Sequence, residues 1–185
     1  MNISITGNLG AGKSSVCREL KKMGFEIVSV GKIFRQIAQE RNISVRDFNE
    51  MVNTMHEQGD DSIDFEIDQK TARLNLEIDN AVFDSRLAWF FAEGSFKVFL
   101  KLDIDEAAKR VYYGNSRQAE SYISIEEAKR SLIERSNFET ERYIEIYNLD
   151  YMNMSNFDLI IDSANLTPKE IAENIVCELK KHESI

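Results

Sequence analysis

The chain has 185 residues, of which 43% are hydrophobic and 30% are charged, and its formal net charge at pH 7 is −9. This length predicts a single domain that spans residues 1–185 and has enough apolar side chains for an ordinary core. The negative charge argues against broad, non-specific binding to nucleic acid or to an anionic membrane, although it allows a local basic pocket.

Two cysteines, Cys17 and Cys177, lie far apart, and no Cys-x-x-Cys pair or Cys/His cluster accompanies them. We expect both to be reduced core side chains, forming neither a disulfide nor a zinc site. The apolar start of the chain is too short for a signal peptide, and no segment is apolar over the length that spans a bilayer. The sequence therefore predicts a cytoplasmic protein.

Five short runs rich in Ile, Val and Phe alternate with amphipathic segments of helical length. Such runs are typical of strands that are covered on both faces of a sheet. Strand–helix alternation predicts an α/β fold of three layers, with a five-stranded parallel sheet and right-handed crossovers. The predicted strands cover residues 3–6, 25–30, 80–84, 96–102 and 157–162.

The first predicted strand leads directly into the loop GNLGAGKSS at residues 7–15. Gly7, Gly12, Lys13 and Ser14 match the pattern G-x-x-x-x-G-K-[ST] between a predicted strand and a predicted helix, the context that a phosphate-binding loop (P-loop) requires. The glycines let backbone N–H groups turn toward a phosphate, and the helix directs the positive end of its dipole to the same place. The sequence therefore predicts a nucleoside triphosphate site.

The residues of this loop have separate expected roles. Lys13 is expected to bridge the β- and γ-phosphates of ATP, and Ser14 is expected to bind Mg²⁺. The alternative is a glycine-rich turn that carries a lysine by chance, which the strand–loop–helix context disfavours. The loop residues expected to bind ATP are Gly7, Asn8, Gly10, Ala11, Gly12, Lys13, Ser14 and Ser15.

Three later helices have capping signals at their first turn. In each, a Ser or Thr is followed three residues later by an acidic residue, so that the hydroxyl oxygen can accept a hydrogen bond from the backbone N–H there. A proline within the last of these turns is harmless, since its missing N–H has no helical partner at that position. The pairs are Ser44/Asp47, Ser124/Glu127 and Thr167/Glu170.

A triphosphate loop leaves the destination of the γ-phosphoryl group open. A GTPase normally needs the guanine-reading tetrapeptide N-K-x-D after a strand, and the sequence does not contain it. Arginines instead follow the predicted strands, and phosphoryl transfer between two anions needs such residues to bring donor and acceptor together. These features favour a kinase of a small molecule.

Segments along nearly the whole chain resemble one family of small kinases. In order, they are VGKIFRQIAQERNIS, FEIDQKTARL, FDSRLAWFF, FKVFLKLDIDEAAKRV, SIEEAKRSLIERSNFETERYIEIYNLD and FDLIID. From residue 2 to about residue 176 the chain resembles the cytidylate kinase group of P-loop nucleoside monophosphate kinases, especially its short archaeal-type branch. The resemblance implies a P-loop NTPase fold, a helical acceptor-binding region at about 31–78 and a short lid or hinge at about 112–124.

The resemblance also implies an acceptor site and a metal site. Arg35 and Arg86 match arginines that bind the acceptor monophosphate, and a guanidinium group suits a phosphate because it can bind it bidentately. Asp84 ends the third predicted strand, where an acid can hold Mg²⁺. Asp64 and Asp68 are candidate readers of the exocyclic amine of cytosine, within a cluster of acids that we otherwise expect to be a solvated face.

The donor side of the site depends on three further arginines. Arg110, after the fourth predicted strand, is expected to reach the ATP. Arg135 and Arg142 have the separation of the family's lid arginines, seven residues or about two helical turns, so both leave the same helix face. We expect this pair, with Lys13, to act in catalysis by closing over the transferred phosphate; the alternative is a positive stripe on a solvated helix.

The sequence thus favours transfer of the γ-phosphoryl group of Mg-ATP to a nucleoside monophosphate, with CMP or dCMP as acceptor, by a protein expected to be a monomer, with a dimer left open. A P-loop kinase of another metabolite and a nucleotide-binding regulatory protein remain as alternatives. Ser136 and Gly114 stand where the family usually has a glutamate and an arginine, and these departures leave the acceptor's identity open.

Overall fold

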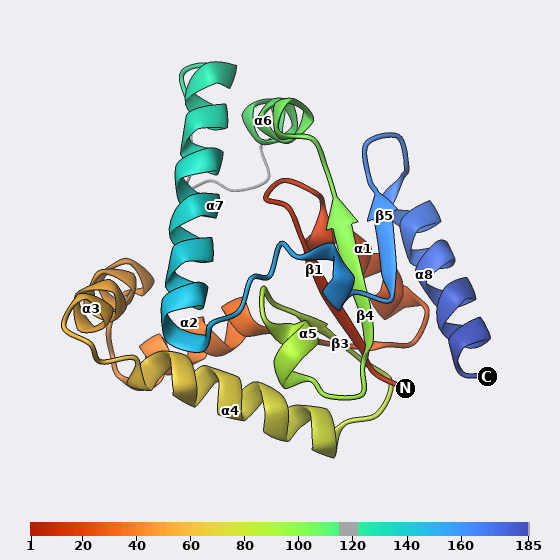
Figure 1. The fold of residues 1–185 in the computed structure, drawn as a ribbon, viewed down its shortest axis with the longest axis horizontal. Helices are drawn as coiled ribbons and strands as arrows, with labels where there is room; N and C mark the ends of the chain where they lie inside the picture. The colour runs from red at the N-terminus through yellow and green to blue at the C-terminus, as the bar shows by residue number, and fades with distance from the viewer. Residues whose placement is uncertain (115–121, 185) are drawn as a thin grey trace.

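The computed structural model describes residues 1–114 and 122–184, in which five strands form one parallel sheet. The spatial order is β2-β3-β1-β4-β5, so β1, which carries the glycine-rich loop, lies in the centre (Figure 1). The prediction of a five-stranded parallel α/β sheet is confirmed. The strands are β1 (Ile3–Gly7), β2 (Glu26–Ser29), β3 (Ala81–Asp84), β4 (Phe96–Lys101) and β5 (Leu159–Asp162).

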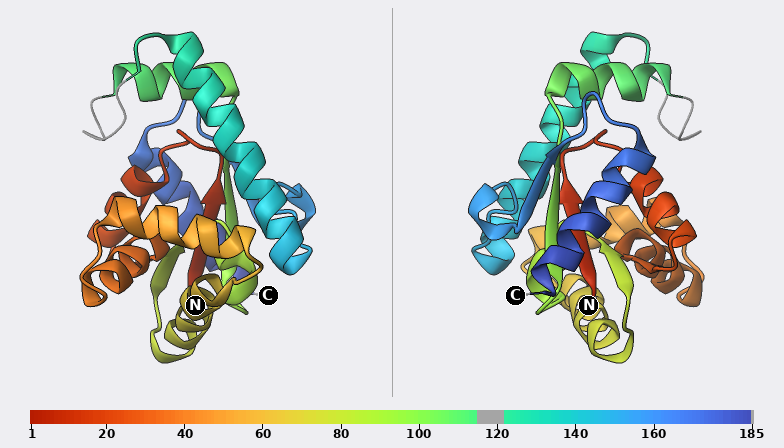
Figure 2. Two further views of the ribbon diagram at one scale, coloured as in Figure 1. Left: turned by 90° about the vertical axis from the view of Figure 1, so that its left-hand side faces the viewer. Right: turned by 90° about the vertical axis from the view of Figure 1, so that its right-hand side faces the viewer.

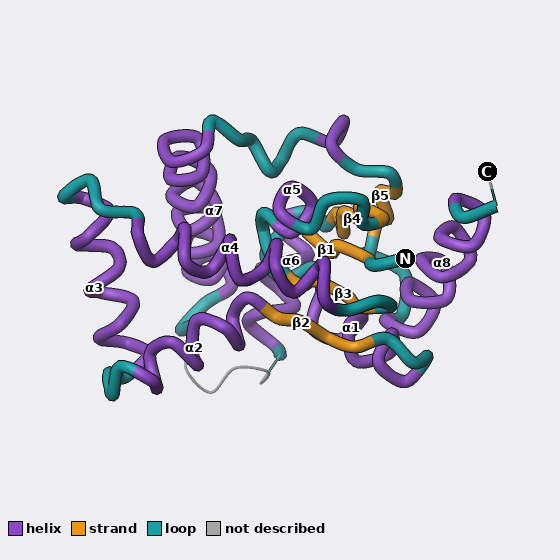
Figure 3. The backbone as a smooth tube through the Cα atoms, turned by 90° about the horizontal axis from the view of Figure 1, so that it is seen from below, coloured by secondary structure: helices purple, strands orange, loops and turns teal. Residues whose placement is uncertain are grey.

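Helices cover both faces of the sheet. Seen from below, the strands lie between α1 and α8 on one side and α4 and α5 on the other (Figure 3). Four predicted strands, 25–30, 80–84, 96–102 and 157–162, were one or two residues too long. At β2, for example, Val30 belongs to the helix that follows rather than to the strand. The helices are α1 (Lys13–Lys22), α2 (Val30–Glu40), α3 (Val45–Glu57), α4 (Ser62–Glu77), α5 (Ala88–Phe91), α6 (Ile104–Tyr113), α7 (Ile125–Tyr147) and α8 (Pro168–His182).

Alternate side chains of the central strands supply the two halves of the core. Ile3 and Ile5 of β1 are fully buried in one cluster with Leu20 of α1 and Ile175 of α8. Because side chains alternate across a strand, neighbouring residues face the opposite helical layer. The core therefore fixes the sheet against α1, and with it the position of the loop that joins β1 to α1.

Helices α2, α3 and α4 form a second apolar unit beside the sheet. Phe83 of β3 is buried with Ile37 of α2, Phe48 of α3 and Ile67 of α4. These helices extend to one side of the sheet in Figure 1 and enclose a separate part of the core. The unit presents a helical wall beside the carboxyl ends of β2 and β3.

Two helices rise above the carboxyl ends of the strands. Figure 2 shows α6 and α7 meeting above the glycine-rich loop, with α7 then descending toward α3 and α4. In an open parallel α/β sheet, ligands bind outside the carboxyl ends of the strands. The long α7, 23 residues, therefore connects the region above the loop with the helical wall.

The predicted capping signals are confirmed. The hydroxyl oxygens of Ser44 and Ser124 accept hydrogen bonds from backbone N–H groups three residues later, and Thr167 forms a reciprocal capping box with Glu170. These bonds satisfy N–H groups that have no partner within the helix. Local sequence thus sets the starts of α3, α7 and α8.

The two cysteines have different environments. Cys17 lies on the buried face of α1, as expected. The expectation that Cys177 belongs to the core was wrong, because it lies on the exposed side of α8. Within the described ranges, no helix combines the length and the apolar character needed to cross a membrane.

Replacing Thr167 by Ala should lower the free energy of unfolding by about 1 kcal/mol, since the backbone N–H of Glu170, now bonded to the Thr167 hydroxyl at 3.2 Å, would lose its partner. Thr54→Ala is the matched control, because the Thr54 hydroxyl only bonds a carbonyl within α3. Urea unfolding measures both. Equal losses in the two variants would contradict the capping role.

Candidate active site

The loop after β1 is held against β4 by its backbone. A Cβ atom on Gly7 would lie 2.4 Å from the carbonyl oxygen of Leu100, so only glycine fits there. The next residue, Asn8, donates its backbone N–H to the Leu100 carbonyl at 3.0 Å, and its side-chain oxygen accepts from the N–H of Leu102 at 2.9 Å. The Asn8 side chain thus anchors the loop against β4.

The loop ends in a left-handed turn that starts α1. Gly12 has a φ of 87° at the N-cap of α1, in the left-handed region that glycine adopts without strain. The first N–H groups of a helix have no intrahelical acceptor, so those of Lys13 and Ser14 point out of the helix end. This end carries the partial positive charge that binds phosphate groups.

Lys13 folds back over the loop. Its Nζ donates a hydrogen bond to the Gly7 carbonyl at 3.1 Å. Burial, aided by the nearby positive charge of Arg86, lowers the pKa of Lys13 to about 7, while Asp84 and Glu139 act in the opposite direction. A nearby negative charge, such as a phosphate, would raise the pKa of this lysine and favour its charged form.

Arg86 reaches the same carbonyl from the other side. Its NH1 donates to the Gly7 oxygen at 2.8 Å, and its Nε donates to Glu139 on α7 at 2.7 Å. Its guanidinium carbon also lies 5.7 Å from the ring centre of Tyr151. Although burial acts to lower the pKa of Arg86, Glu139 holds it above its usual value. Two cations therefore converge on Gly7.

Asp84 and Ser14 supply oxygen atoms near this point. Asp84 ends β3 beside Ile5 of β1, and its carboxylate is close enough to Lys13 to act on the lysine's pKa. Ser14 is exposed in the first turn of α1. A hydroxyl and a carboxylate are hard oxygen ligands of the kind that magnesium prefers.

A pocket opens between the helical wall and α7. Its lining combines aromatic side chains, including Phe34 and Phe138, with polar side chains from α3, α4 and α7. Arg142 donates from NH2 to Asp64 at 2.5 Å and from NH1 to Asn53 at 3.0 Å. The pocket thus has a polar, charged side and an apolar side, which suits a planar polar ligand.

Asp68 lies in the same pocket, where burial disfavours its charged form. The hydroxyl of Tyr147 donates a hydrogen bond to it. Burial raises the pKa of Asp68 to about 6, against the effect of this hydrogen bond and with a smaller contribution from the negative charge of Asp64. A group that donates a hydrogen bond would find an acceptor here.

Comparison with known proteins decides the family. Residues 2–165 match the model of the cytidylate kinase-like family. The chain belongs to this family. The cytidylate kinase of Methanobrevibacter smithii is 32% identical over 181 residues, which cover 97% of this chain and 99% of that protein. The cytidylate kinase of Pyrococcus abyssi is 34% identical over 171 residues, with 91% and 88% covered.

A solved structure gives independent support for the fold. Shikimate kinase from Bacteroides thetaiotaomicron superposes with a TM-score of 0.62 at 17% identity, covering 100% of this chain and 99% of that one. At this identity the likeness concerns the P-loop fold alone. The family match identifies the protein as a nucleoside monophosphate kinase, and the likeness supports its three-layer α/β fold.

The kinase brings some predicted site residues together and separates others. Lys13, Arg86 and Asp84 gather around the end of β1, and Arg135 lines the pocket with Asp68. Arg35 is exposed on α2, outside the described residues that line the pocket. Its helix, α2, nevertheless borders the pocket through Val30 and Phe34.

The two predicted lid arginines point to different neighbours. Both line the pocket, in agreement with a common helix face. Arg135 donates to Glu139 at 2.9 Å, near the loop, whereas Arg142 is 9% exposed and bound to Asp64 and Asn53 of the helical wall. In this structure Arg142 therefore belongs to the polar side of the pocket rather than to a cover over the P-loop.

Arg110 binds protein carbonyls on the donor side of the kinase. Its NH2 donates to the carbonyls of Ser163 and Ala164 at 2.6 and 2.9 Å, which joins α6 to the loop after β5. The lid or hinge expected at about 112–124 includes residues 115–121, which lie outside the described residues. The described neighbours of that segment are the end of α6 and the start of α7.

Sequence reasoning missed Glu139, Asn53 and Tyr147, which bind predicted site residues. The one available signal was spacing: Glu139 follows Arg135 by four residues, a separation at which helical side chains meet. Asn53 and Tyr147 lie 89 and 79 residues from their partners, Arg142 and Asp68. Their roles depend on how the helices pack.

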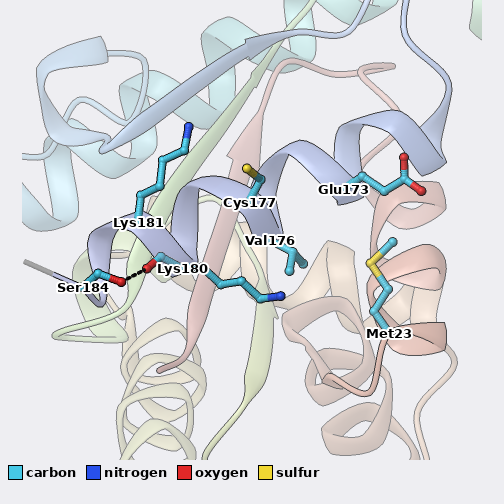
Figure 4. Close-up of a pocket in the computed structure, with 7 residues that line it drawn as sticks. All are labelled: Met23, Glu173, Val176, Cys177, Lys180, Lys181 and Ser184. Carbon is cyan, nitrogen blue, oxygen red and sulfur yellow. Dashed lines mark hydrogen bonds between the residues drawn. The ribbon is translucent and has the colours of Figure 1, made fainter.

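A second groove lies on the far side of the sheet, between the end of α1 and α8. Figure 4 shows Met23, Val176 and Cys177 in it, with the chains of Lys180 and Lys181 beside them. The groove is mainly apolar and is not part of the glycine-rich loop. The groove therefore lies outside the candidate active site.

Replacing Asp68 by Asn should raise the free energy of unfolding at pH 8 by about 1 kcal/mol, a value reduced from the full pKa shift because the side chain is partly open to solvent. An acid whose pKa is higher in the folded state makes the protein less stable as pH rises from about 4 to 6, so the gain should vanish near pH 4. Asn can still accept the Tyr147 hydrogen bond. Urea unfolding at several pH values measures the gain.

Asp64→Asn is the control for this experiment. It breaks the ion pair with the buried Arg142, so it should destabilise the protein at pH 8. If Asp68→Asn lowered the free energy of unfolding at pH 8 as much as the control does, the charged form of Asp68 would not destabilise the folded protein.

Proposed function

We propose that the protein transfers the γ-phosphoryl group of ATP to a pyrimidine nucleoside monophosphate, CMP or dCMP. The observation that carries the proposal is the convergence of Lys13 and Arg86 on the carbonyl of Gly7, at 3.1 and 2.8 Å. One cation belongs to the glycine-rich loop and the other follows β3 beside the pocket. A donor phosphate and an acceptor phosphate bound by these two cations would meet at the end of β1.

ATP fits the loop side of this site. The end of α1 offers outward-pointing N–H groups, and Lys13 supplies a charge that would bridge the β- and γ-phosphates. We assign the backbone of Gly7, Asn8, Gly10, Ala11, Gly12 and Ser15 to the same cradle. Arg110 bounds the donor side through its bonds to the loop after β5.

The residues near Lys13 also fit a magnesium ion. The Ser14 hydroxyl would bind it directly, and Asp84 would hold it through water or directly. Bound with ATP, the ion would neutralise part of the charge on the phosphates. These side chains fit because their oxygen atoms lie at the ends of adjacent secondary structure elements, α1 and β3.

The pocket between α7 and the helical wall would hold the acceptor. Arg86, Arg135 and Arg35 would bind its phosphate, because guanidinium groups match phosphate oxygens in geometry and charge. The polar side of the pocket would read the base. Cytosine has an exocyclic amine that can donate to Asp68, whereas uracil presents a carbonyl oxygen that a carboxylate would repel. The names of the relatives, cytidylate kinases, agree with this choice.

Catalysis would then consist of alignment and charge compensation. Lys13 would hold the γ-phosphoryl group while Arg86 and Arg135 hold the attacking phosphate oxygen in line with it. As the phosphoryl group moves, the three cations would offset the charge on its oxygens, and no covalent intermediate on the protein is needed. Arg142 would keep Asp64 and Asn53 in place around the base.

An ADP-release assay with CMP, dCMP, UMP, AMP and GMP tests the proposal directly. CMP or dCMP should accelerate ATP consumption at least 100-fold over the rate without an acceptor. If a purine monophosphate is the best acceptor, the base assignment is wrong; if none accelerates the reaction, the transfer itself is wrong.

Binding of ATP should take up protons between pH 7 and 8.5. Lys13 is largely uncharged in the free protein above pH 7, and bound phosphates would return its pKa toward the usual range, so affinity should fall as pH rises. Calorimetry in two buffers with different ionisation enthalpies measures this uptake. Lys13→Met should abolish the lysine's share of it and lower kcat by about 1,000-fold or more. An equal uptake by the variant would assign the proton to another group.

Arg35→Ala should raise KM for the acceptor by about tenfold or more and leave ATP binding unchanged, because a lost charge-assisted bond to phosphate weakens the acceptor alone. Lys32→Ala is the matched control, since Lys32 is an exposed cation on the same helix, α2. Steady-state kinetics with each substrate varied in turn separates the two. Unchanged acceptor parameters in Arg35→Ala would remove this residue from the site.

A further inference from the structure

We propose that Glu139 is a positioning residue for phosphoryl transfer: one carboxylate that orients Arg86 and Arg135 together and acts on the reaction through them. The inference rests on the proposed function, because it concerns the two arginines assigned to the acceptor phosphate. Glu139 lines the pocket, but both of its carboxylate oxygens are taken by arginines, so it would act through them rather than on a substrate. It would fix the relative placement of a residue that follows β3 and a residue on α7.

Both oxygens of the Glu139 carboxylate are engaged by arginines. Oε2 accepts from Nε of Arg86 at 2.7 Å, and Oε1 accepts from Nε of Arg135 at 2.9 Å. The Glu139 side chain is 18% exposed, against 44% for Arg135. Although burial acts to raise the pKa of Glu139, the two guanidinium groups hold it below its usual value, so the carboxylate is charged at neutral pH.

The Arg86 guanidinium is fixed at two points. Glu139 holds its Nε, and the Gly7 carbonyl holds its NH1 at 2.8 Å. Two bonds to a planar group define its plane and leave little rotation about the side chain. This is the kind of preorganisation that matters for catalysis, because an arginine already in place needs no reorganisation when the charge moves.

The same carboxylate joins α7 to the glycine-rich loop. Glu139 lies 53 residues from Arg86 in the sequence, and Arg86 shares the Gly7 carbonyl with Lys13. The described bonds therefore run from Arg135 through Glu139 and Arg86 to the loop. Through this series of bonds, the position of α7 is set relative to the end of β1.

Charge gives Glu139 a second reason to be here. Lys13 and Arg86 both bond the Gly7 carbonyl, and Arg135 shares Glu139 with Arg86, so three cationic side chains lie close to one another. The nearby charge of Arg86 acts to lower the pKa of Lys13. Glu139 compensates two of the three cations through direct bonds and also favours the charged form of Lys13. A neutral side chain of the same shape would keep the packing and lose this compensation.

The test compares Glu139→Gln with Glu141→Gln, an exposed glutamate two residues further along α7. Glutamine keeps the shape but loses the charge, and its amide nitrogen cannot accept from an arginine. We expect Glu139→Gln to lower kcat with CMP by 10- to 100-fold, with KM for ATP within threefold of the original, and Glu141→Gln to match the original protein. If the ion pair were purely structural, Glu139→Gln would lower the midpoint of thermal unfolding and leave kcat and KM as in the original protein.

A double-mutant cycle tests whether Glu139 acts through its partner. In an Arg135→Ala background, Glu139→Gln should cost at least threefold less in kcat than in the original protein, because part of its effect is already lost. If Glu139→Gln fails to fold, Glu139→Asp decides instead, since the shorter carboxylate cannot hold both arginines in the same geometry and should also lower kcat.

The outcomes separate this inference from the function on which it rests. A protein that phosphorylates no nucleoside monophosphate would refute the proposed function and this role with it. An active protein whose folded Glu139 variant keeps kcat within twofold of the original would overturn the inference alone. Additive effects of the Arg135 and Glu139 substitutions would also overturn it.

Discussion

The site depends on the carbonyl oxygen at the end of the central strand. Gly7 can end β1 there because it has no Cβ, which would otherwise meet the Leu100 carbonyl of β4. The close approach of the two strands leaves the Gly7 oxygen turned toward the site, where it accepts from Lys13 and Arg86. A single backbone acceptor thereby holds two cations from different parts of the chain in one place.

Local charge in this protein differs from its overall charge. The chain has a formal net charge of −9, yet cations gather at the carboxyl ends of β1 and β3. Carboxylates balance these arginines: Glu139 pairs with Arg86 and Arg135, and Asp64 pairs with Arg142. A substrate with phosphate groups would be attracted to this site, while the acidic remainder of the surface repels larger polyanions.

Local rules account for most of what the sequence could predict. The five strands follow from short apolar runs, the starts of α3, α7 and α8 from hydroxyl caps, and the glycine-rich loop from its motif and context. The predicted strand at β2 was too long because Val30 is apolar and β-branched, which is typical of strands, although it begins α2. Cys177 was misplaced since its apolar side chain suggested burial, whereas the face of α8 that carries it points outward.

The partners of the site residues could not be predicted in this way. The bonds of Arg142 to Asp64 and of Arg86 to Glu139 join residues 78 and 53 positions apart. They form because α7 runs from above the sheet to the helical wall, so that its side chains meet residues far away in the sequence. Spacing placed Arg135 and Arg142 on one face of a helix, but it could not assign them different neighbours.

The most direct measurement of the central claim is the change in backbone amide signals, by two-dimensional NMR, when magnesium and ATP are added. The account predicts that the largest shifts fall on Gly10, Gly12, Lys13 and Ser14, because their N–H groups would bind the phosphates. Shifts concentrated instead around the groove between α1 and α8, or no shifts at all, would contradict it.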